Sequence, residues 1–149
     1  MSWSKDGTIL FHSQHPANRF LQDIFRLDPN LGKVTRVTDS RGQPWHFTMP
    51  AVSPDGKRIA VLRYAKSTPV PPSEIFLMNA DGTAVVPVAG TGATVNEFPR
   101  WSRDGEHLVY TAFVGKYRHI FMVPAAGGEP VPLTTGQWDD VHADIGGVP

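Results

Sequence analysis

One pentapeptide pattern occurs three times in this chain, and its spacing restricts the fold more than any other sequence feature. It reads Trp or Val, Ser, any residue, Asp, Gly, and it occupies residues 3–7, 52–56 and 101–105. The separation is 49 residues both from Ser4 to Ser53 and from Ser53 to Ser102. Self-similarity at a fixed period of this length indicates a tandem array of supersecondary units.

Each copy of the pentapeptide introduces the same series of short strands. The Asp-Gly pair is typical of a hairpin turn that needs a positive φ. The expected strands lie at residues 9–11, 59–61 and 108–110, then at 24–27, 75–78 and 120–123, with a short last strand ending at 37–38, 88–89 and 133–134. No stretch has a sustained apolar period of 3.6 residues, so no helix longer than one turn is expected. The sequence predicts an all-β fold, a β-propeller with three four-stranded antiparallel blades.

Composition excludes several functional classes. The 149 residues carry 14 basic and 14 acidic side chains, so no net charge favours nucleic acid or an anionic membrane as a partner. The chain has no cysteine, which excludes disulfides and thiolate chemistry. We expect neither a signal peptide nor a membrane span, because the sequence contains no basic segment followed by an apolar run and no 18 consecutive apolar residues.

The repeat resembles the TolB-like, WD-like propeller family with its Trp-Ser-Pro-Asp-Gly core, which also occurs in propeller domains of prolyl oligopeptidase and dipeptidyl peptidase relatives. The resemblance covers essentially the whole chain and is most specific at residues 51–60 and 75–82. Lys5 and Arg103 replace the proline of the family core, and the turn of the first copy is one residue shorter. The expected blades span about residues 2–49, 50–98 and 99–149.

Three blades do not close a ring, and ring closure is what removes exposed sheet edges. The resemblance implies six or more blades. We therefore expect a homodimer in which each chain supplies half of a six-bladed ring, since two-fold closure is the commonest symmetric solution. The end of one copy is expected to complete the innermost strand of the next. The alternative is a truncated half of a larger propeller-containing peptidase or transport protein.

A ligand site is expected at the channel mouth formed by the long, dissimilar loops, because variable loops on a rigid scaffold usually carry binding residues. The starts of the innermost strands line this mouth in a closed ring. The candidate ligand-binding residues are His46, Asn96, Glu97, His142 and Asp144, together with the loop tryptophans Trp45 and Trp138.

Other conspicuous residues have structural interpretations. We expect the aspartates of the three Asp-Gly turns to cap their own turns through hydrogen bonds from the backbone. Trp3 and Trp101 are expected to fill the core between blades, where a large aromatic area contributes most to packing.

The sequence does not identify a catalytic set. It contains neither a Gly-x-Ser-x-Gly elbow nor a His-Glu-x-x-His motif. An alternative function is a metal-dependent enzyme like the propeller lyases and lactonases, with His12 and His15, His142 and a carboxylate holding the metal at the channel mouth. The spacing of these histidines matches no defined metal motif, so no metal and no cofactor is predicted.

The expected function is therefore a non-catalytic interaction scaffold. Its predicted partners are a second copy of the chain and a protein segment or small molecule bound at the channel mouth. The sequence does not indicate a compartment, although the family includes periplasmic members.

Overall fold

The computed structural model describes residues 1–16, 18–66, 73–88 and 96–143. Blade 1 consists of β1 (Ser2–Trp3), β2 (Ile9–His15), β3 (Asn18–Asp28) and β4 (Lys33–Arg36). Blade 2 consists of β5 (Trp45–Val52), β6 (Arg58–Ala65), β7 (Ser73–Asn79) and β8 (Val86–Pro87). Blade 3 consists of β9 (Asn96–Trp101), β10 (His107–Val114), β11 (Tyr117–Pro124) and β12 (Val131–Pro132).

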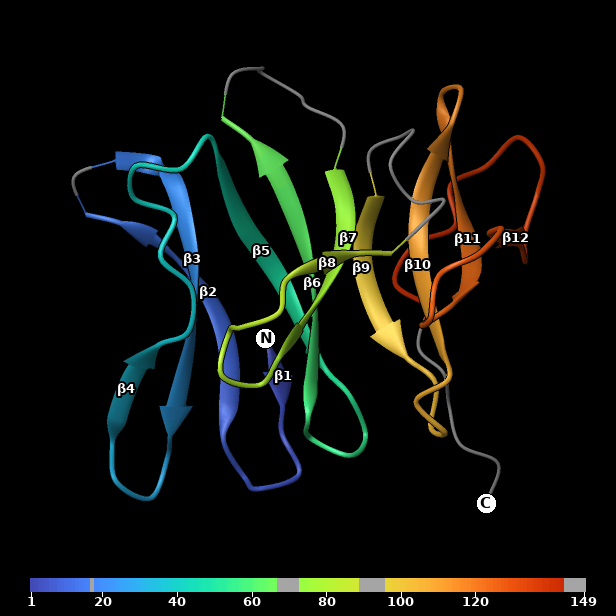
Figure 1. The fold of residues 1–149 in the computed structure, drawn as a ribbon. Helices are drawn as coiled ribbons and strands as arrows, with labels where there is room; N and C mark the ends of the chain where they lie inside the picture. The colour runs from blue at the N-terminus through green and yellow to red at the C-terminus, as the bar shows by residue number, and fades with distance from the viewer. Residues whose placement is uncertain (17, 67–72, 89–95, 144–149) are drawn as a thin grey trace.

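Each blade is a four-stranded antiparallel sheet whose strands pair in sequence order, and the described residues include no helix. Figure 1 shows the three sheets side by side, with blade 2 between the other two. The predicted all-β class and the three four-stranded antiparallel blades are confirmed. In particular, no helix long and apolar enough to cross a membrane occurs among the residues described.

The Asp-Gly turns have the predicted geometry. Gly56 and Gly105 adopt φ values of 77° and 74°, in the region that favours glycine. Asp55 Oδ1 accepts hydrogen bonds from the Ser53 hydroxyl at 2.6 Å and from the Lys57 amide at 3.0 Å. Asp104 accepts the equivalent hydrogen bonds from the Ser102 hydroxyl and the Glu106 amide, whereas Asp6 accepts from the amide and the hydroxyl of Thr8, at 3.0 Å and 2.7 Å. The prediction that these aspartates cap their own turns is confirmed.

Strand pairing fixes which positions of the three blades are equivalent. Trp3, Val52 and Trp101 pair with Ile9, Ile59 and Leu108, respectively. The spacing within the first pair is one residue smaller, so the turn of blade 1 is shorter, as its sequence indicates. Two residues related in this way are called equivalent below.

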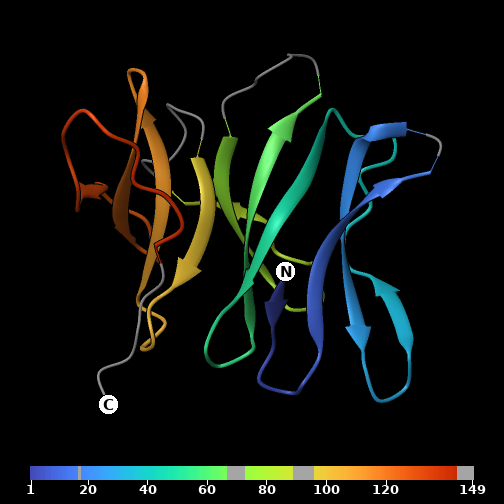
Figure 2. The ribbon, with the colours of Figure 1, turned by 180° about the vertical axis from the view of Figure 1, so that it is seen from behind.

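The core consists of two apolar layers, one on each face of blade 2. Side chains on β6 alternate between the layers, as the two-residue period of a strand requires. Ile59 and Val61 pack toward blade 1 with Leu10, whereas Ala60 and Leu62 pack toward blade 3. Figure 2 shows blade 2 flanked by its neighbours from the opposite side. Blade 2 is thus buried on both faces, and each outer blade packs against blade 2 through one face.

The two tryptophans of the repeat differ in environment. Trp101 is 9% exposed, and its indole Nε1 donates a hydrogen bond to the Ala51 carbonyl oxygen of blade 2 at 2.9 Å. The prediction that Trp101 fills the core between blades is confirmed. The same prediction for Trp3 is wrong, since Trp3 is 64% exposed. Trp101 is covered by the blade before it, whereas the structure contains no blade before blade 1.

We expect the turn carboxylates to make stability depend on acid pH. The hydrogen bond from the Ser53 side chain, followed by that from the Lys57 amide, lowers the pKa of Asp55 below its ordinary value of 3.8. Because the pKa is lower in the folded state, this stabilisation is complete above about pH 4 and is lost as the pH falls through the folded-state pKa. In urea unfolding from about pH 5 to about pH 2, Asp55→Asn should lose less stability than the wild type. Glu129→Gln, at an exposed carboxylate outside these turns, should keep the wild-type slope, and equal slopes for all three proteins would contradict the assignment.

Candidate channel-mouth site

The three first strands of the blades, β1, β5 and β9, form the inner side of the array. β5 contacts both β1 and β9. A hollow of about 450 Å³ lies along these strands, lined by residues 2–5, 51–54 and 100–103. These are the first three residues of each repeated pentapeptide and the residue just before it. The hollow therefore marks the turn-side end of the expected channel.

The predicted site residues of β5 and β9 lie at the opposite, loop-side end of the inner strands. His46 is at the start of β5, and its ring stacks on Tyr64 with centroids 5.6 Å apart. Burial is the main cause that lowers the pKa of His46 below its ordinary value of 6.5. At neutral pH the ring is therefore uncharged and offers one donor and one acceptor. Its buried Nδ1 has no hydrogen-bond partner among the residues that the structure describes.

Asn96 starts β9 and forms hydrogen bonds with Ser73 of the neighbouring strand β7. It is 1% exposed, and its backbone amide donates to the Ser73 hydroxyl at 2.6 Å. That hydroxyl donates to the Asn96 carbonyl oxygen at 2.8 Å, and the side-chain amide of Asn96 donates to the Ser73 carbonyl oxygen. These hydrogen bonds join the first strand of blade 3 to β7 of blade 2. Asn96 therefore positions the start of β9 and so the neighbouring Glu97.

Glu97 belongs to a charged cluster. Its carboxylate lies 3.4 Å from Arg118 Nε, and the Arg118 guanidinium lies 3.9 Å from the Asp139 carboxylate. The Asp139 carboxylate also accepts a hydrogen bond from the Arg118 amide at 2.8 Å. Glu97 and Asp139 are far apart in sequence, and Arg118, at the start of β11, connects them. We call Glu97, Arg118 and Asp139 the charged cluster; it can recognise polar or charged groups of a ligand.

The remaining candidates are in different places. The Arg63 guanidinium lies 5.2 Å from the centre of the Trp45 ring on β5. Trp45 also lines a hollow of about 330 Å³ between blades 1 and 2. Trp138 is 62% exposed, and its ring lies against Gly136 of its own loop. His142 packs on Phe98 of β9 with ring centroids 4.0 Å apart. Asp144 lies outside the described residues. His46 and Glu97 thus lie on inner strands, and His142 contacts β9. Trp45 is also on β5 but lines the hollow between blades 1 and 2, so it does not share a site with Trp138.

Sequence reasoning missed a backbone feature of the inner strands. Met49 and Phe98 are equivalent, and they have φ values of 50° and 53°, which are uncommon for side chains other than glycine. In both strands the pairing register shifts at this point, so that each strand contains a β-bulge. The Met49 amide donates to His12 Nδ1 at 3.3 Å, and the Phe98 amide donates to Met49 Sδ at 3.4 Å. The bulges therefore link the three blades along the inner side.

A sequence signal for these bulges was present. Pro50 and Pro99 follow the two bulge residues and recur with the spacing of the repeat. A proline disfavours the α region for the residue before it but does not by itself predict a positive φ. The recurrence of this proline on the inner strands was the sequence signal that indicated a special backbone conformation at the residue before it.

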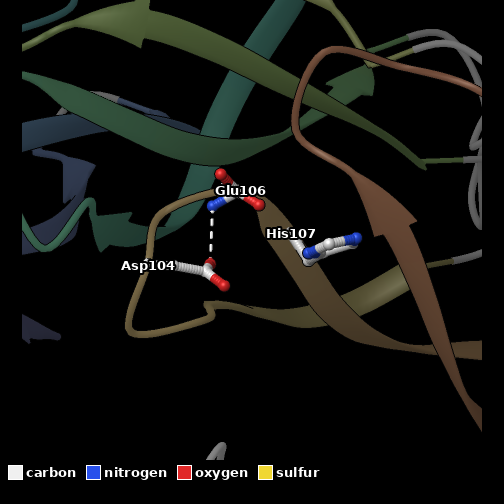
Figure 3. Close-up of side chains that lie close together, drawn as sticks. All are labelled: Asp104, Glu106 and His107. Atoms are coloured by element: carbon white, nitrogen blue, oxygen red, sulfur yellow. Dashed lines mark hydrogen bonds between the residues drawn. The ribbon is translucent and has the colours of Figure 1, made fainter.

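Within the described ranges, the three histidines considered for a metal, His12, His15 and His142, do not form a group of potential ligands. Among the described residues, the one group with three potential ligand atoms within 4.8 Å of one another is Asp104, Glu106 and His107, in the turn after β9 and at the start of β10 (Figure 3). Asp104 Oδ1 already accepts hydrogen bonds from the Ser102 hydroxyl and, at 2.8 Å, from the Glu106 amide. Since every copy of the turn uses its aspartate in this way, we assign Asp104 to turn capping.

Comparisons with known proteins identify the fold. The curated Tol-Pal system protein TolB of Francisella tularensis subsp. tularensis is 32% identical over 87 residues, which cover 56% of this chain and 18% of the relative. The TolB of subspecies holarctica is 37% identical over 60 residues, covering 40% of this chain and 13% of that protein. The chain thus matches only a minor part of these relatives. No family model matches it.

Solved structures extend the likeness to nearly the whole chain. A putative TolB from Agrobacterium tumefaciens superposes with a TM-score of 0.72 at 22% identity, covering 89% of this chain and 47% of that one. TolB from Acinetobacter baumannii gives 0.68 at 20% identity, covering 94% and 33%. The chain therefore has the TolB-like β-propeller fold, as its repeat predicts, and spans about half or less of the matched structures.

Proposed function

We propose that this chain is an interaction scaffold that binds a protein segment at the loop-side end of its inner strands. In this proposal the units of about residues 2–49, 50–98 and 99–149 act as blades, and two copies together form a six-bladed ring. The ring presents the site twice. No chemical step is assigned to the chain.

The charged cluster is the observation that carries the proposal. At the turn-side end of the blades, each aspartate is used within its own turn, so the repeated polar groups serve the fold. At the loop-side end, Glu97 and Arg118 are 22% and 36% exposed and can contact a ligand. Charged and polar groups held by a rigid scaffold are suited to recognition.

The kind of ligand follows from the cluster and from the relatives. The carboxylates and the guanidinium of the charged cluster, together with the neutral imidazole of His46, offer both hydrogen-bond donors and acceptors. Such groups suit a peptide backbone and its polar side chains. The curated relatives are named as proteins of the Tol-Pal system, which favours a protein segment over a small molecule.

A labelled panel of twelve-residue peptides that differ in charge tests the proposal by fluorescence polarisation. We expect at least one peptide to bind with a dissociation constant below about 1 mM, equivalent to about 4 kcal/mol. Replacing Glu97 by glutamine removes one charge while keeping the shape, and should weaken that binding by about tenfold, as expected for a charged hydrogen bond.

The matched control is Glu129→Gln, which makes the same change at an exposed carboxylate in the turn between β11 and β12, at the turn-side end of blade 3. It should bind the same peptide as the wild type does. Equal losses in the two variants would show nonspecific electrostatic binding. Absence of binding by every peptide would contradict a protein segment as the ligand.

A further inference from the structure

In the part of the chain that the structure describes, no other blade covers one apolar face of blade 1. On blades 2 and 3, the face toward the preceding blade is buried, with Ile59 and Leu108 both 0% exposed. The equivalent Ile9 of blade 1 is only half-buried. Phe11 and Leu27 are half-buried as well, whereas the residues equivalent to them on blades 2 and 3 are buried. We call this surface the open face; it consists of Trp3, Ile9, Phe11, Phe25 and Leu27.

The equivalent face of blade 3 is covered by blade 2, and this contact shows which groups pack against such a face. Trp101 donates its indole N–H to the Ala51 carbonyl oxygen, on the inner strand of the preceding blade. The Arg58 guanidinium, also from blade 2, lies 4.8 Å from the centre of the Trp101 ring and donates to the Gly105 carbonyl oxygen at 3.2 Å. A tryptophan at this position is therefore enclosed by a backbone carbonyl and a basic side chain of the preceding blade.

Blade 3 carries both of these partners at equivalent positions. Arg100 precedes Trp101 as Ala51 precedes Val52, so the Arg100 carbonyl is equivalent to that of Ala51. His107 precedes Leu108 as Arg58 precedes Ile59, so its ring is equivalent to the Arg58 guanidinium. Blade 3 thus has the groups that enclose a tryptophan, while blade 1 has a tryptophan that is not enclosed.

The stacking of the turns continues the same pattern. A side-chain carbon added to Gly105 would lie 3.6 Å from Pro54 of blade 2, and one added to Gly56 would lie 3.7 Å from Ser4 of blade 1. The turn of each blade therefore rests on the turn of the blade before it. A side-chain carbon added to Gly7, the equivalent residue of blade 1, would have no atom within 4 Å in the described structure. This turn is uncovered together with the open face.

We infer that the open face of blade 1 docks on blade 3 of a second copy of this chain, with Trp3 as the anchor. The inference rests on the proposed two-copy ring and specifies its contact. The Trp3 indole N–H donates to the Arg100 carbonyl oxygen of the second copy, and the partner's His107 lies over the Trp3 ring. On blade 3, Val109, Thr111 and Ile120 are already buried within one chain, so the docking contact centres on the inner strand.

A second copy fits the surface better than an unrelated partner for two reasons. The two buried interfaces of the structure are both formed between blades of this chain, so the docking contact continues an interface that already exists. The formal net charge of the chain is zero, so two copies do not repel one another over long range.

The dissociation constant of the dimer, measured by sedimentation equilibrium, tests the inference through a matched pair of variants. Trp3→Ala and Trp138→Ala make the same change at residues that are 64% and 62% exposed in one chain. Trp3→Ala should weaken the dimer by at least about 30-fold, as expected for a buried tryptophan anchor. Trp138→Ala should leave it within about twofold. Circular dichroism spectra of both variants should match that of the wild type.

The outcomes separate the inference from the proposed function. A dimer that Trp3→Ala leaves intact would overturn the open face as the contact, while the two-copy ring would stand. A wild-type protein that is monomeric at all concentrations would overturn both the contact and the ring. Peptide binding at the charged cluster is measured separately, so its failure would not alter either result. A large loss in Trp3→Ala alone supports the inference.

Discussion

Replacing Trp101 by alanine is expected to lower the free energy of unfolding by about 3–5 kcal/mol. The side chain is 9% exposed and packs in the apolar layer between blades 2 and 3. Its removal leaves a cavity there and leaves the Ala51 carbonyl without the indole donor. It also removes the ring on which the Arg58 guanidinium stacks. Urea unfolding followed by circular dichroism measures this loss.

Two variants identify the source of the effect. Trp101→Phe keeps most of the apolar area but cannot donate the hydrogen bond, so it should cost clearly less than the alanine variant. Trp3→Ala changes the equivalent residue of blade 1 and should cost less than about 1 kcal/mol at concentrations where the protein is monomeric, because Trp3 is 64% exposed. Similar losses at Trp3 and Trp101 would contradict the described difference in packing.

Replacing Leu62 by alanine is expected to lower the free energy of unfolding by about 2–5 kcal/mol. Leu62 is on the central strand β6, is 0% exposed and faces the layer shared with blade 3. Neighbouring side chains come from two different sheets, so the cavity cannot be closed by the movement of one side chain. A loss of this size is a large part of the total stability of a domain, which is typically about 5–15 kcal/mol.

The matched control is Leu31→Ala, which makes the same chemical change at a residue that is 74% exposed. It should change the free energy of unfolding by no more than about 0.5 kcal/mol. A comparison of the two variants in the same urea titration removes the intrinsic difference between leucine and alanine. A loss below about 1 kcal/mol at Leu62 would show that the two blades do not share a tightly packed layer.

Most of the fold could be predicted from the repeat, because residues close together in the sequence determine each turn and each strand. The Asp-Gly pair with its preceding serine sets a turn through contacts within five residues, and the alternating apolar residues that follow define a strand with two buried faces. Trp101 was placed correctly because the preceding blade lies in the same chain. Trp3 was placed wrongly because repeat logic assumes a neighbour on each side, and the structure has none before blade 1.

The candidate site was less predictable, since its contacts join residues distant in sequence. The pattern indicated that Glu97 starts an inner strand, but it did not indicate that Arg118 from blade 3 pairs with it. Nor did it show that Ser73 occupies the hydrogen-bonding groups of Asn96. The bulges at Met49 and Phe98 depend on the register between strands, which no single segment determines.

The solution mass of the wild-type protein, measured by light scattering after size exclusion over a range of concentrations, tests the account most directly. A mass near twice the 16.4 kDa of one chain is expected, because the open face of blade 1 is proposed to dock on blade 3 of a second copy. A mass that remains near 16.4 kDa at every concentration would contradict a ring built from two copies.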